Sequence, residues 1–593
     1  MASFNHVEAS ASEYGARVLM LAAENGAIAG AKVGGMADVI RDLPLAMAGM
    51  GVAVDVAMPN FGNLINTADA RWVGDVQLQF SGQEYQVGVY QAAHPALDNC
   101  NFYLFQHPLF NGSYGAYSQG DANRPFAEDA TKFALFNLAV AEALRCDTHA
   151  VNNQGIAQKR IEQSSFFKAL PNIVHLHDWH TAPFAVLRAF DPNYAFLQAL
   201  PCVFSIHNLA LQGIRPIRDE PSSFAAWYPE LLAQLSEQQL NLFRDPRYPN
   251  CINPMRAGIV LSDKVHLVSP SYAEEVLLPS EAEKGFFGGE GLEQDLLNRL
   301  EEQALVGILN GCMYPDGSGE SNHLSEPTSD LNRQQLINSH IELAQEKLIA
   351  WQVGNTQVRT QDFIAKHRLQ QWQRSVSEQG QADGGHVDEA QTSPFIMTSV
   401  GRLTDQKVLI LRARFPSDIA LASLRGKTVL EALLDRLAKH QADARFVLLG
   451  SGDEVIAREF SDIAAKYPQF VFLNGYDEQL SQQLYQLGSL FLMPSSFEPC
   501  GISQMLAMRE GQLCLVNRIG GLKDTVHHLE TGFVFEGDDL LAQGLSLLAM
   551  FEQALSMVDS QAWLAMQQHA RMQRFDWHSQ AQRYKQRLYS LSD

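Results

Sequence analysis

Residues Ile173–His177 read IVHLH and residues Cys202–Ile206 read CVFSI, and these two runs decide the fold. They are short and continuous and show no strict apolar–polar alternation, which is typical of strands buried on both faces of a parallel sheet. Each run is followed by a turn and then by a longer amphipathic stretch. The pattern predicts strand–helix–strand units and a doubly wound α/β domain.

The same pattern extends through the first half of the chain and returns in the second half. Helical spacing of apolar residues between the runs is clearest over Ala127–Leu144. Two Rossmann-like domains in tandem are therefore expected, and we expect the carboxyl edges of their sheets to face one cleft that binds ligands. The further runs expected as strands are Arg17–Ala23, Val52–Met58, Asn101–Phe105, Lys264–Val268, Val306–Leu309, Phe395–Val400, Arg445–Leu449, Val471–Leu473, Leu490–Met493, Leu513–Val516 and Gly532–Phe535.

A polar interval separates the two halves. Residues 375–392 (SVSEQGQADGGHVDEAQT) have almost no apolar content, and we expect an exposed loop without regular structure there. The expected organisation is an N-terminal domain over residues 1–315, a connecting segment over 316–393 and a C-terminal domain over 394–564.

Composition limits the classes of function. The 593 residues carry a formal net charge of −22, which disfavours binding to nucleic acid and to anionic membranes. No run of about twenty apolar residues is present, and no basic segment followed by an apolar one opens the chain. The seven cysteines are scattered without a C-x-x-C pair, which favours free thiols in a reducing compartment, so we expect the cytoplasm.

A glycine pair opens a helix after the first strand, in Lys32–Val39 (KVGGMADV). Backbone N–H groups at Gly34 and Gly35 can approach an anion closely, and a helix N-terminus favours negative charge. Lys32 brings a cation to the same turn. The stretch is neither G-x-G-x-x-G nor a P-loop, and a tight turn with a surface lysine is the alternative.

Two histidine-containing stretches lie at the ends of the expected strands Ile173–His177 and Cys202–Ile206. HLHDWH (residues 175–180) has three histidines and Asp178, which raises a metal site as one possibility. No further ligand is evident elsewhere, so a polar loop at the cleft edge is the preferred interpretation. His207 and Asn208 follow the next strand, and their position on the predicted ligand side favours a functional role over that of a buried structural histidine.

The second domain supplies cations and a fixed carboxylate. Arg402 and Lys407 lie in GRLTDQK after its first strand, where both can bind phosphate oxygens, and a solvated basic turn is the alternative. Glu498 lies in MPSSFEPCG past the end of another buried strand, in a loop shaped by proline and glycine. A carboxylate held there is suited to accept hydrogen bonds from sugar hydroxyls. The glycines before Thr525, in GGLKDT, offer a second anion site of backbone amides.

Taken together, these motifs make the chain resemble the glycogen synthases and the bacterial and plant starch synthases that use ADP-glucose. The matching stretches occur in the family's order and span roughly residues 17–535. The chain departs from the family pattern at Arg256, Cys312 and Val408. The stretches are KVGGMADV, HDWHTAP, FSIHNLALQG, VSPSYAEEV, GILNG, GRLTDQK, LLGSGD, GYDE, LMPSSFEPCG and GGLKDTV.

The resemblance implies the GT-B fold, an α/β architecture of two Rossmann-like doubly wound domains facing one cleft. It implies that the closing segment, residues 565–593, returns to the N-terminal domain. It also implies a retaining transfer of glucose from ADP-glucose to the non-reducing end of an α-1,4-glucan. The partners are then ADP-glucose and an α-glucan acceptor, without nucleic acid or membrane, and the oligomeric state stays open.

The resemblance also assigns roles to residues. His207 would lie at the anomeric centre and Glu498 would hold glucose hydroxyls, while Asp178 and Asn253 would line the sugar subsite. Tyr476 would lie along the adenine. The implied catalytic residues are His207, Glu498, Asp178, Arg402 and Lys407, and the implied donor-binding residues are Lys32, Gly34, Gly35, Asp38, Asn253, Tyr476, Cys500, Gly501, Gly521 and Thr525.

No D-x-D metal signature is evident, so we expect no cofactor and no metal. Fixed cations and helix termini would stabilise the charge of the leaving diphosphate instead. Two alternatives stay open: a GT-B transferase that uses another nucleotide sugar or acceptor, including UDP-glucose, and a catalytically weak paralogue that binds glucan or nucleotide. The joint presence of Lys32, Arg402, Lys407 and Glu498 argues against the second.

Overall fold

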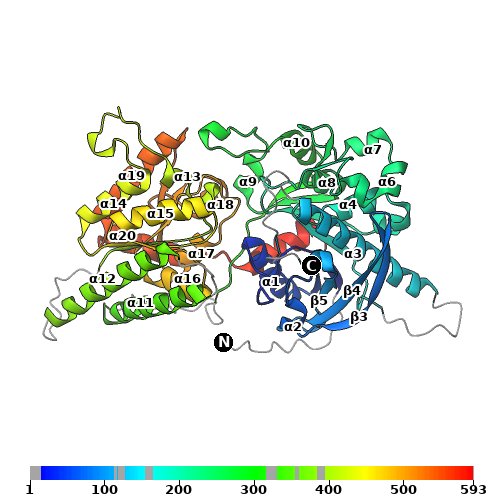
Figure 1. The fold of residues 1–593 in the computed structure, drawn as a ribbon, viewed down its shortest axis with the longest axis horizontal. Coiled ribbons are helices and arrows are strands. Elements are labelled where there is room, and N and C mark those ends of the chain that lie inside the picture. Colours follow the sequence, from blue (N-terminus) through cyan, green and yellow to red (C-terminus); the bar gives the residue numbers. More distant parts are fainter. Residues whose placement is uncertain are drawn as a thin grey trace. The chain divides into compact units, whose positions relative to one another are not determined.

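The computed structural model describes residues 15–111, 116–117, 127–153, 165–314, 330–353, 359–382 and 394–591. The chain divides into two compact units, which are described separately here (Figure 1). Unit 1 comprises Met1–Ser280, Phe287–Met313 and Asp576–Asp593, and unit 2 comprises Glu281–Phe286 and Tyr314–Phe575.

The described residues of unit 1 form a nine-stranded sheet in the order β11-β10-β7-β6-β1-β2-β5-β4-β3. The pairs from β11 to β5 are parallel, and β3 and β4 add an antiparallel edge. A separate two-stranded sheet joins β8 and β9. The strands are β1 (Ala16–Leu21), β2 (Val52–Pro59), β3 (Arg71–Phe80), β4 (Gln83–Ala93), β5 (Asn101–Gln106), β6 (Ile173–His177), β7 (Cys202–Ile206), β8 (Arg215–Pro216), β9 (Cys251–Ile252), β10 (Lys264–Leu267) and β11 (Leu305–Gly307).

Helices connect these strands and cover the sheet. The central strands β2, β6 and β7 are buried at every residue, as expected of strands with helices on both faces. The helices of unit 1 are α1 (Gly35–Ala48), α2 (Leu64–Thr67), α3 (Ala127–Asn153), α4 (Pro183–Phe190), α5 (Phe224–Trp227), α6 (Pro229–Gln234), α7 (Glu237–Asn241), α8 (Pro254–Leu261), α9 (Pro270–Glu275), α10 (Glu293–Glu301) and α21 (Trp577–Arg583).

The described residues of unit 2 form a six-stranded, fully parallel sheet in the order β14-β13-β12-β15-β16-β17. Because the order reverses direction at β12 and β15, the loops after these two strands lie at the switch point where such sheets bind ligands. The strands are β12 (Ile396–Val400), β13 (Arg445–Leu449), β14 (Phe470–Leu473), β15 (Leu490–Met493), β16 (Leu513–Asn517) and β17 (Gly532–Phe535).

Capping residues fix where several helices of unit 2 begin. Thr428 and Glu431 form a capping box at the start of α14, and Asp453, Asp477 and Asp539 accept backbone N–H groups at the starts of α15, α16 and α19. The helices are α11 (Asp330–Val353), α12 (Thr360–Ala382), α13 (Asp405–Arg412), α14 (Val429–His440), α15 (Glu454–Lys466), α16 (Glu478–Leu487), α17 (Ser503–Arg509), α18 (Gly520–Thr525), α19 (Leu540–Met557) and α20 (Gln561–Met572).

Within the polar interval of residues 316–393, the described stretches Asp330–Val353 and Thr360–Ala382 form a helical hairpin. Helices α11 and α12 pack against each other and belong to unit 2 (Figure 1). Residues 375–382, expected as loop, complete α12, whereas residues 383–393 lie outside the described part of the chain. The low average apolar content concealed one buried stripe on each helix, because the apolar residues recur at helical spacing. The stripes are Ile337, Ile341, Ala344 and Leu348 on α11, and Ala365, Leu369, Trp372 and Val376 on α12.

The antiparallel edge of unit 1 was not expected either. Strands β3 and β4 alternate apolar with polar residues and have one exposed side, unlike the continuous runs used to predict the sheet. In addition, the helix predicted over Ala127–Leu144 continues to Asn153.

The C-terminal helix α21 packs against α1 of unit 1, as the resemblance implied. The crossing to unit 1 lies at Asp576 rather than near residue 565, because α20 packs against α17 and the sheet of unit 2. Among the described helices, α19 alone is long and apolar enough to cross a membrane by length and composition. It packs against α14 and strands β16 and β17, and 33% of it is buried inside the structure.

A buried chain of hydrogen bonds fastens the C-terminus to the sheet of unit 1. The Tyr589 hydroxyl lies 2.8 Å from His175 Nδ1, and His175 Nε2 lies 2.7 Å from Ser205 Oγ. Ser205 Oγ in turn lies 2.8 Å from His266 Nδ1. Because all four residues are buried, losing one partner leaves an unsatisfied polar group in the core.

We therefore expect Tyr589→Phe to lower the stability of unit 1 by about 1–3 kcal/mol. Differential scanning calorimetry measures the shift in the melting transition. Tyr248→Phe is the matched control, because the Tyr248 side chain is 57% exposed and its loss of a hydroxyl should have no effect. Equal melting of Tyr589→Phe and the unaltered protein would contradict the role of this hydrogen-bond chain.

Candidate active site

The glycine turn after β1 is held by a carboxylate that sequence analysis missed. Glu24 Oε2 accepts hydrogen bonds from the backbone N–H of Val33, at 2.8 Å, and of Gly34, at 2.5 Å. Its other oxygen accepts from the Tyr117 hydroxyl at 2.6 Å, and Glu24 is buried. Of the two glycine amides predicted to approach an anion, that of Gly34 thus donates to an internal carboxyl group in this structure. A carboxylate between a strand end and a nearby glycine turn is the signal that could have identified it.

Lys32 and Asp38 form a pair beside this turn. Lys32 Nζ donates to Asp38 Oδ1 at 2.7 Å, and Arg41 lies 3.1 Å from the same oxygen. Gly34 is the N-cap of α1 and Gly35 is its first residue, so the predicted motif does open a helix. The structure therefore brings Lys32, Gly34, Gly35 and Asp38 together at the carboxyl end of β1.

Asp178 and His207 are brought together because β6 and β7 are neighbouring parallel strands. Asp178 Oδ1 accepts from the backbone N–H of His207 at 2.7 Å and of Asn208 at 3.3 Å. Asp178 itself has a left-handed backbone, with φ of 57°, which aspartate tolerates better than most residues. Its carboxylate thus fixes the backbone that carries His207.

The histidines of the site are neutral. His207 Nε2 lies 3.0 Å from His177 Nδ1, and their rings stack. Burial, and then the neighbouring His266, lowers the pKa of His207 to about 3, and burial lowers the pKa of His177 well below its ordinary value. His177 therefore positions an uncharged His207 imidazole.

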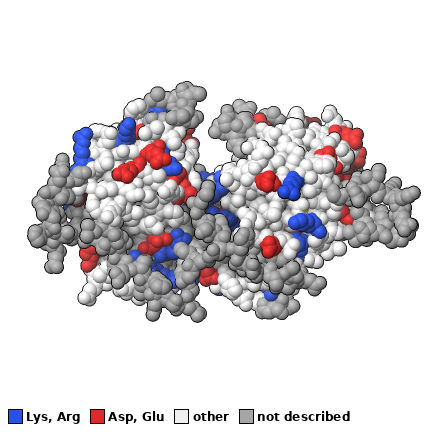
Figure 2. Space-filling view, turned by 90° about the horizontal axis from the view of Figure 1, so that it is seen from below, with Lys and Arg blue, Asp and Glu red and all other residues white. Residues whose placement is uncertain are grey.

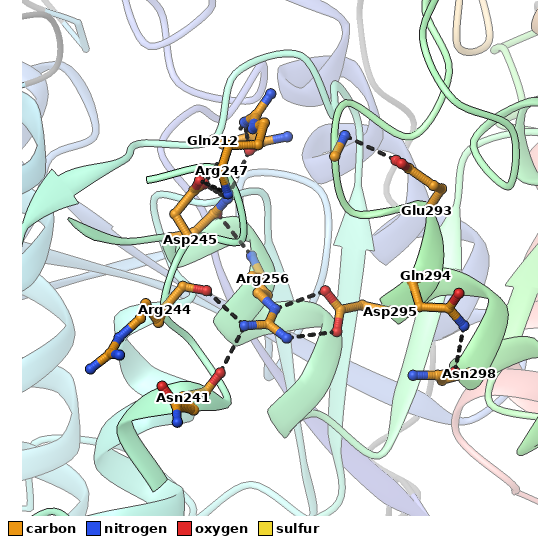
Figure 3. A network of polar contacts seen from close by, with 12 residues as sticks. Gln212, Asn241, Arg244, Asp245, Arg247, Arg256, Glu293, Gln294, Asp295 and Asn298 are labelled. Atoms are coloured by element: carbon orange, nitrogen blue, oxygen red, sulfur yellow. Dashed lines mark hydrogen bonds and ion pairs between the residues drawn. The ribbon is translucent and has the colours of Figure 1, made fainter. Parts of the chain in front are cut away.

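Asn253 lies inside a polar network rather than at an open surface. Its amide nitrogen donates to Gln212 Oε1 and to Asp245 Oδ2, each at 2.7 Å, and its oxygen accepts from Arg256 N at the start of α8. Arg247 donates to the same Gln212 oxygen at 2.7 Å (Figure 3). Asn253 is fully buried, so its predicted contact with the sugar stays a prediction. Gln212, Asp245 and Arg247 are the network members that sequence analysis missed.

In unit 2, Lys407 donates directly to Glu498 Oε2, and Ser495 Oγ donates to the same oxygen at 3.1 Å. The loop that carries Glu498 is fastened by the Gln406 carbonyl, which accepts from the backbone N–H of Ser496 at 2.9 Å. Lys407 lies on α13 after β12, and Glu498 follows β15, the neighbouring strand. The two predicted residues therefore meet at the topological switch point.

The second glycine turn packs tightly against this loop. A side chain at Gly521 would place its Cβ 2.1 Å from the Cys500 carbonyl oxygen, so only glycine fits there. Gly521 N donates to the Glu498 carbonyl at 3.1 Å, and Gly501 has a φ of 76° that favours glycine. The buried Thr525 hydroxyl donates to the Gly521 carbonyl at 2.7 Å, so Thr525 stabilises the turn from within.

Arg402 and Tyr476 are the predicted site residues of unit 2 with the most open side chains. Arg402 is exposed and forms no ion pair with another described residue. Tyr476 is 51% exposed in the loop between β14 and α16, which leaves ring surface available for a ligand.

Neither a metal cluster in the described part of the chain nor a continuous basic surface on the face drawn in Figure 2 stands out. No group of three or more His, Cys, Asp or Glu among those residues is arranged to hold a metal, and the expectation that the chain needs none stays a prediction. On the face shown in Figure 2, Lys and Arg side chains of the described residues lie in small groups near acidic ones. All seven cysteines are free thiols.

Comparisons with known proteins place this geometry in a family. The family described as starch synthase catalytic domain matches residues 17–298, and glycosyl transferases group 1 matches residues 422–550. A glycogen synthase of Streptococcus equi subsp. equi is 30% identical over 591 residues, which cover 97% of this chain and 100% of that protein. The chain belongs to the glycogen and starch synthase family of glycosyltransferases.

Other relatives agree with this assignment. A glycogen synthase of Gloeobacter violaceus is 30% identical over 97% of this chain and 99% of its own length. The catalytic domain of starch synthase IV from Arabidopsis thaliana, solved with ADP and acarbose bound, has a TM-score of 0.67 at 24% identity and covers 97% of this chain and 99% of that one. The predicted GT-B class of α/β fold is thereby confirmed.

We expect Asp178 to make the folding stability of this glycosyltransferase depend on pH. Burial raises the pKa of Asp178 from 3.8 to about 7. Between about pH 4 and 7 the unfolded chain therefore releases a proton that the folded protein still holds, and the contribution of Asp178 to stability falls as pH rises. Asp178→Asn removes this dependence. We therefore expect the difference in the free energy of unfolding, variant minus unaltered protein, to increase by about 2–4 kcal/mol between pH 4 and pH 8.

Thermal melting across that pH range provides the measurement. Asp219→Asn is the matched control, because Asp219 also has a left-handed backbone, with φ of 67°, but is exposed. Any benefit of asparagine in this conformation should appear in both variants without pH dependence. Parallel pH profiles for Asp178→Asn and the unaltered protein would refute the raised pKa.

Proposed function

We propose that the chain is a cytoplasmic, retaining glucosyltransferase that adds glucose from ADP-glucose to the non-reducing end of an α-1,4-glucan without a metal ion. Similarity to bacterial glycogen synthases over their full length carries the proposal. ADP as the nucleotide is supported by the starch synthase neighbour, which was solved with ADP bound.

The donor's phosphates are bound by cations in this proposal. The open guanidinium of Arg402 can bind two phosphate oxygens at once, and Lys407 adds a point charge at the same strand edge. As the bond between glucose and the diphosphate breaks, negative charge builds up on the diphosphate and each contact becomes stronger. These cations therefore stabilise the transition state more than they stabilise the bound donor.

Donor binding requires an exchange of partners at Glu498. In the ligand-free state Lys407 neutralises the buried Glu498 carboxylate. When the donor binds, glucose hydroxyls donate to Glu498 and Lys407 turns to the phosphate, so neither charge is left buried and unpaired. The Ser495 hydroxyl keeps Glu498 oriented during this exchange.

His207 lies at the anomeric centre in the proposed complex. A neutral imidazole does not repel the positive charge that develops on the sugar, and the low pKa of His207 keeps it neutral. The acceptor hydroxyl attacks from the side of the leaving phosphate, which retains the configuration, and a phosphate oxygen can take the proton. Lys32 then meets the donor's phosphates, with Asp38 supporting its turn.

Release of nucleotide tests the proposal directly. The purified protein is incubated with ADP-glucose or UDP-glucose, with and without glycogen, and with a chelator in place of added metal. We expect ADP release that depends on glycogen and is unchanged by the chelator. Release of UDP alone would replace the donor, and release of neither from folded protein would favour another acceptor or a glucan-binding paralogue without activity.

Substitutions at the donor site provide the second test. We expect Glu498→Ala and Arg402→Ala each to lower kcat about a hundredfold or more, because each removes a transition-state contact in a site with little water. Arg436→Ala and Glu552→Ala are matched controls, since this Arg–Glu pair joins α14 and α19 on the surface. Unchanged rates for both site variants would overturn the assignment of the donor site.

A further inference from the structure

We propose that the helical hairpin α11–α12 positions the nucleotide-binding loop, residues 474–477, and that Lys347, Trp351 and Arg359 are positioning residues for donor recognition. The inference rests on the proposed function, in which Tyr476 of this loop lies along the adenine. The loop is short, since β14 ends at Leu473 and α16 begins at Glu478.

Arg359 holds the first residue of the loop. Its Nη2 donates to the Asn474 carbonyl at 2.9 Å. The guanidinium is itself fixed by two hydrogen bonds to Asp362, at 2.8 and 2.6 Å, and Asp362 is buried. This bidentate contact leaves the guanidinium little rotational freedom, so its hydrogen bond holds the Asn474 carbonyl in one position.

Trp351 holds the second residue. The indole packs so closely on Gly475 that a Cβ at this position would lie 2.6 Å from the ring atoms. Only glycine allows this approach, so the glycine of the GYDE motif is matched to a tryptophan of the hairpin. The backbone just before Tyr476 therefore rests on a rigid aromatic surface.

Lys347 holds the residue after Tyr476. Its Nζ lies 2.9 Å from Asp477 Oδ2, while Asp477 Oδ1 accepts from Leu480 N and caps α16. One aspartate thus connects the loop to the hairpin on one side and to the helix on the other. The three hairpin contacts involve the residues before and after Tyr476 in the sequence, and Tyr476 itself is 51% exposed.

The hairpin is firmly attached to unit 2, so it can act as a support. Helix α11 packs against α16, and α12 packs against α15 and β14 (Figure 1). Arg368 of α12 donates to the Ala464 and Ala465 carbonyls at the end of α15. Because the loop is ordered before the nucleotide arrives, less conformational entropy is lost on binding.

The experiment removes the two polar contacts together, as Lys347→Ala/Arg359→Ala in the full chain. We expect KM for ADP-glucose and the Kd for ADP, measured by calorimetry, to rise about tenfold, equivalent to about 1.4 kcal/mol. We expect kcat and KM for glycogen to stay within about twofold of the unaltered enzyme. The variant loses binding energy that the bound donor and the transition state share equally, so donor affinity falls while kcat does not. Lys366→Ala/Arg374→Ala is the matched control, since these exposed cations lie on the same hairpin.

A double-mutant cycle with Tyr476→Ala separates positioning from a merely structural role. If the hairpin acts through Tyr476, the tenfold effect disappears in the Tyr476→Ala background. An effect of the same size in that background, or a lower melting temperature with an unchanged Kd for ADP, would overturn the inference. If the unaltered chain neither releases nor binds ADP, the proposed function itself fails and the inference falls with it.

Discussion

Buried carboxylates hold the loops that follow the parallel strands, and the candidate site depends on them. In a parallel sheet, the loop that follows each strand has backbone N–H groups that form no hydrogen bond with a neighbouring strand. Where such an N–H group is buried, it needs another acceptor. Glu24 supplies that acceptor after β1 and Asp178 after β6. In unit 2, Glu498 has a comparable place after β15 but binds side chains. The loops that should meet the donor are thereby ordered without any ligand.

The same arrangement explains the electrostatics of the site. A buried carboxylate is stable only where hydrogen bonds or a cation offset its loss of hydration. Asp178 receives only backbone hydrogen bonds, and burial raises its pKa to about 7. Glu498 instead forms an ion pair with Lys407, so its charge is compensated within the protein. A ligand that binds here exchanges one set of partners for another, which favours a substrate that presents hydroxyls and phosphate together.

Much of the fold could be predicted from sequence, because buried parallel strands form continuous apolar runs. Ile173–His177 and Cys202–Ile206 were predicted with the bounds that the structure shows. The half-exposed strands β3 and β4 and the hairpin α11–α12 were missed, because their apolar residues are diluted by polar ones. Contacts within the site were less accessible. Glu24 is indicated only by its place between a strand end and a glycine turn, and the pairing of Lys407 with Glu498 does not follow from spacing along the chain.

The departures from the family pattern have identifiable surroundings in the structure. Arg256, where the family commonly has lysine, donates twice to Asp295 of α10 and also to the carbonyls of Asn241 and Arg244 (Figure 3). A lysine could not make this planar set of bonds, so arginine here connects α8 to its neighbours. Val408 and Cys312 are buried. Cys312 also forms an isolated parallel bridge with Asp576 just before α21. The three departures thus lie in packed or hydrogen-bonded positions, while the carboxylates that order the loops, Glu24, Asp178 and Glu498, are present.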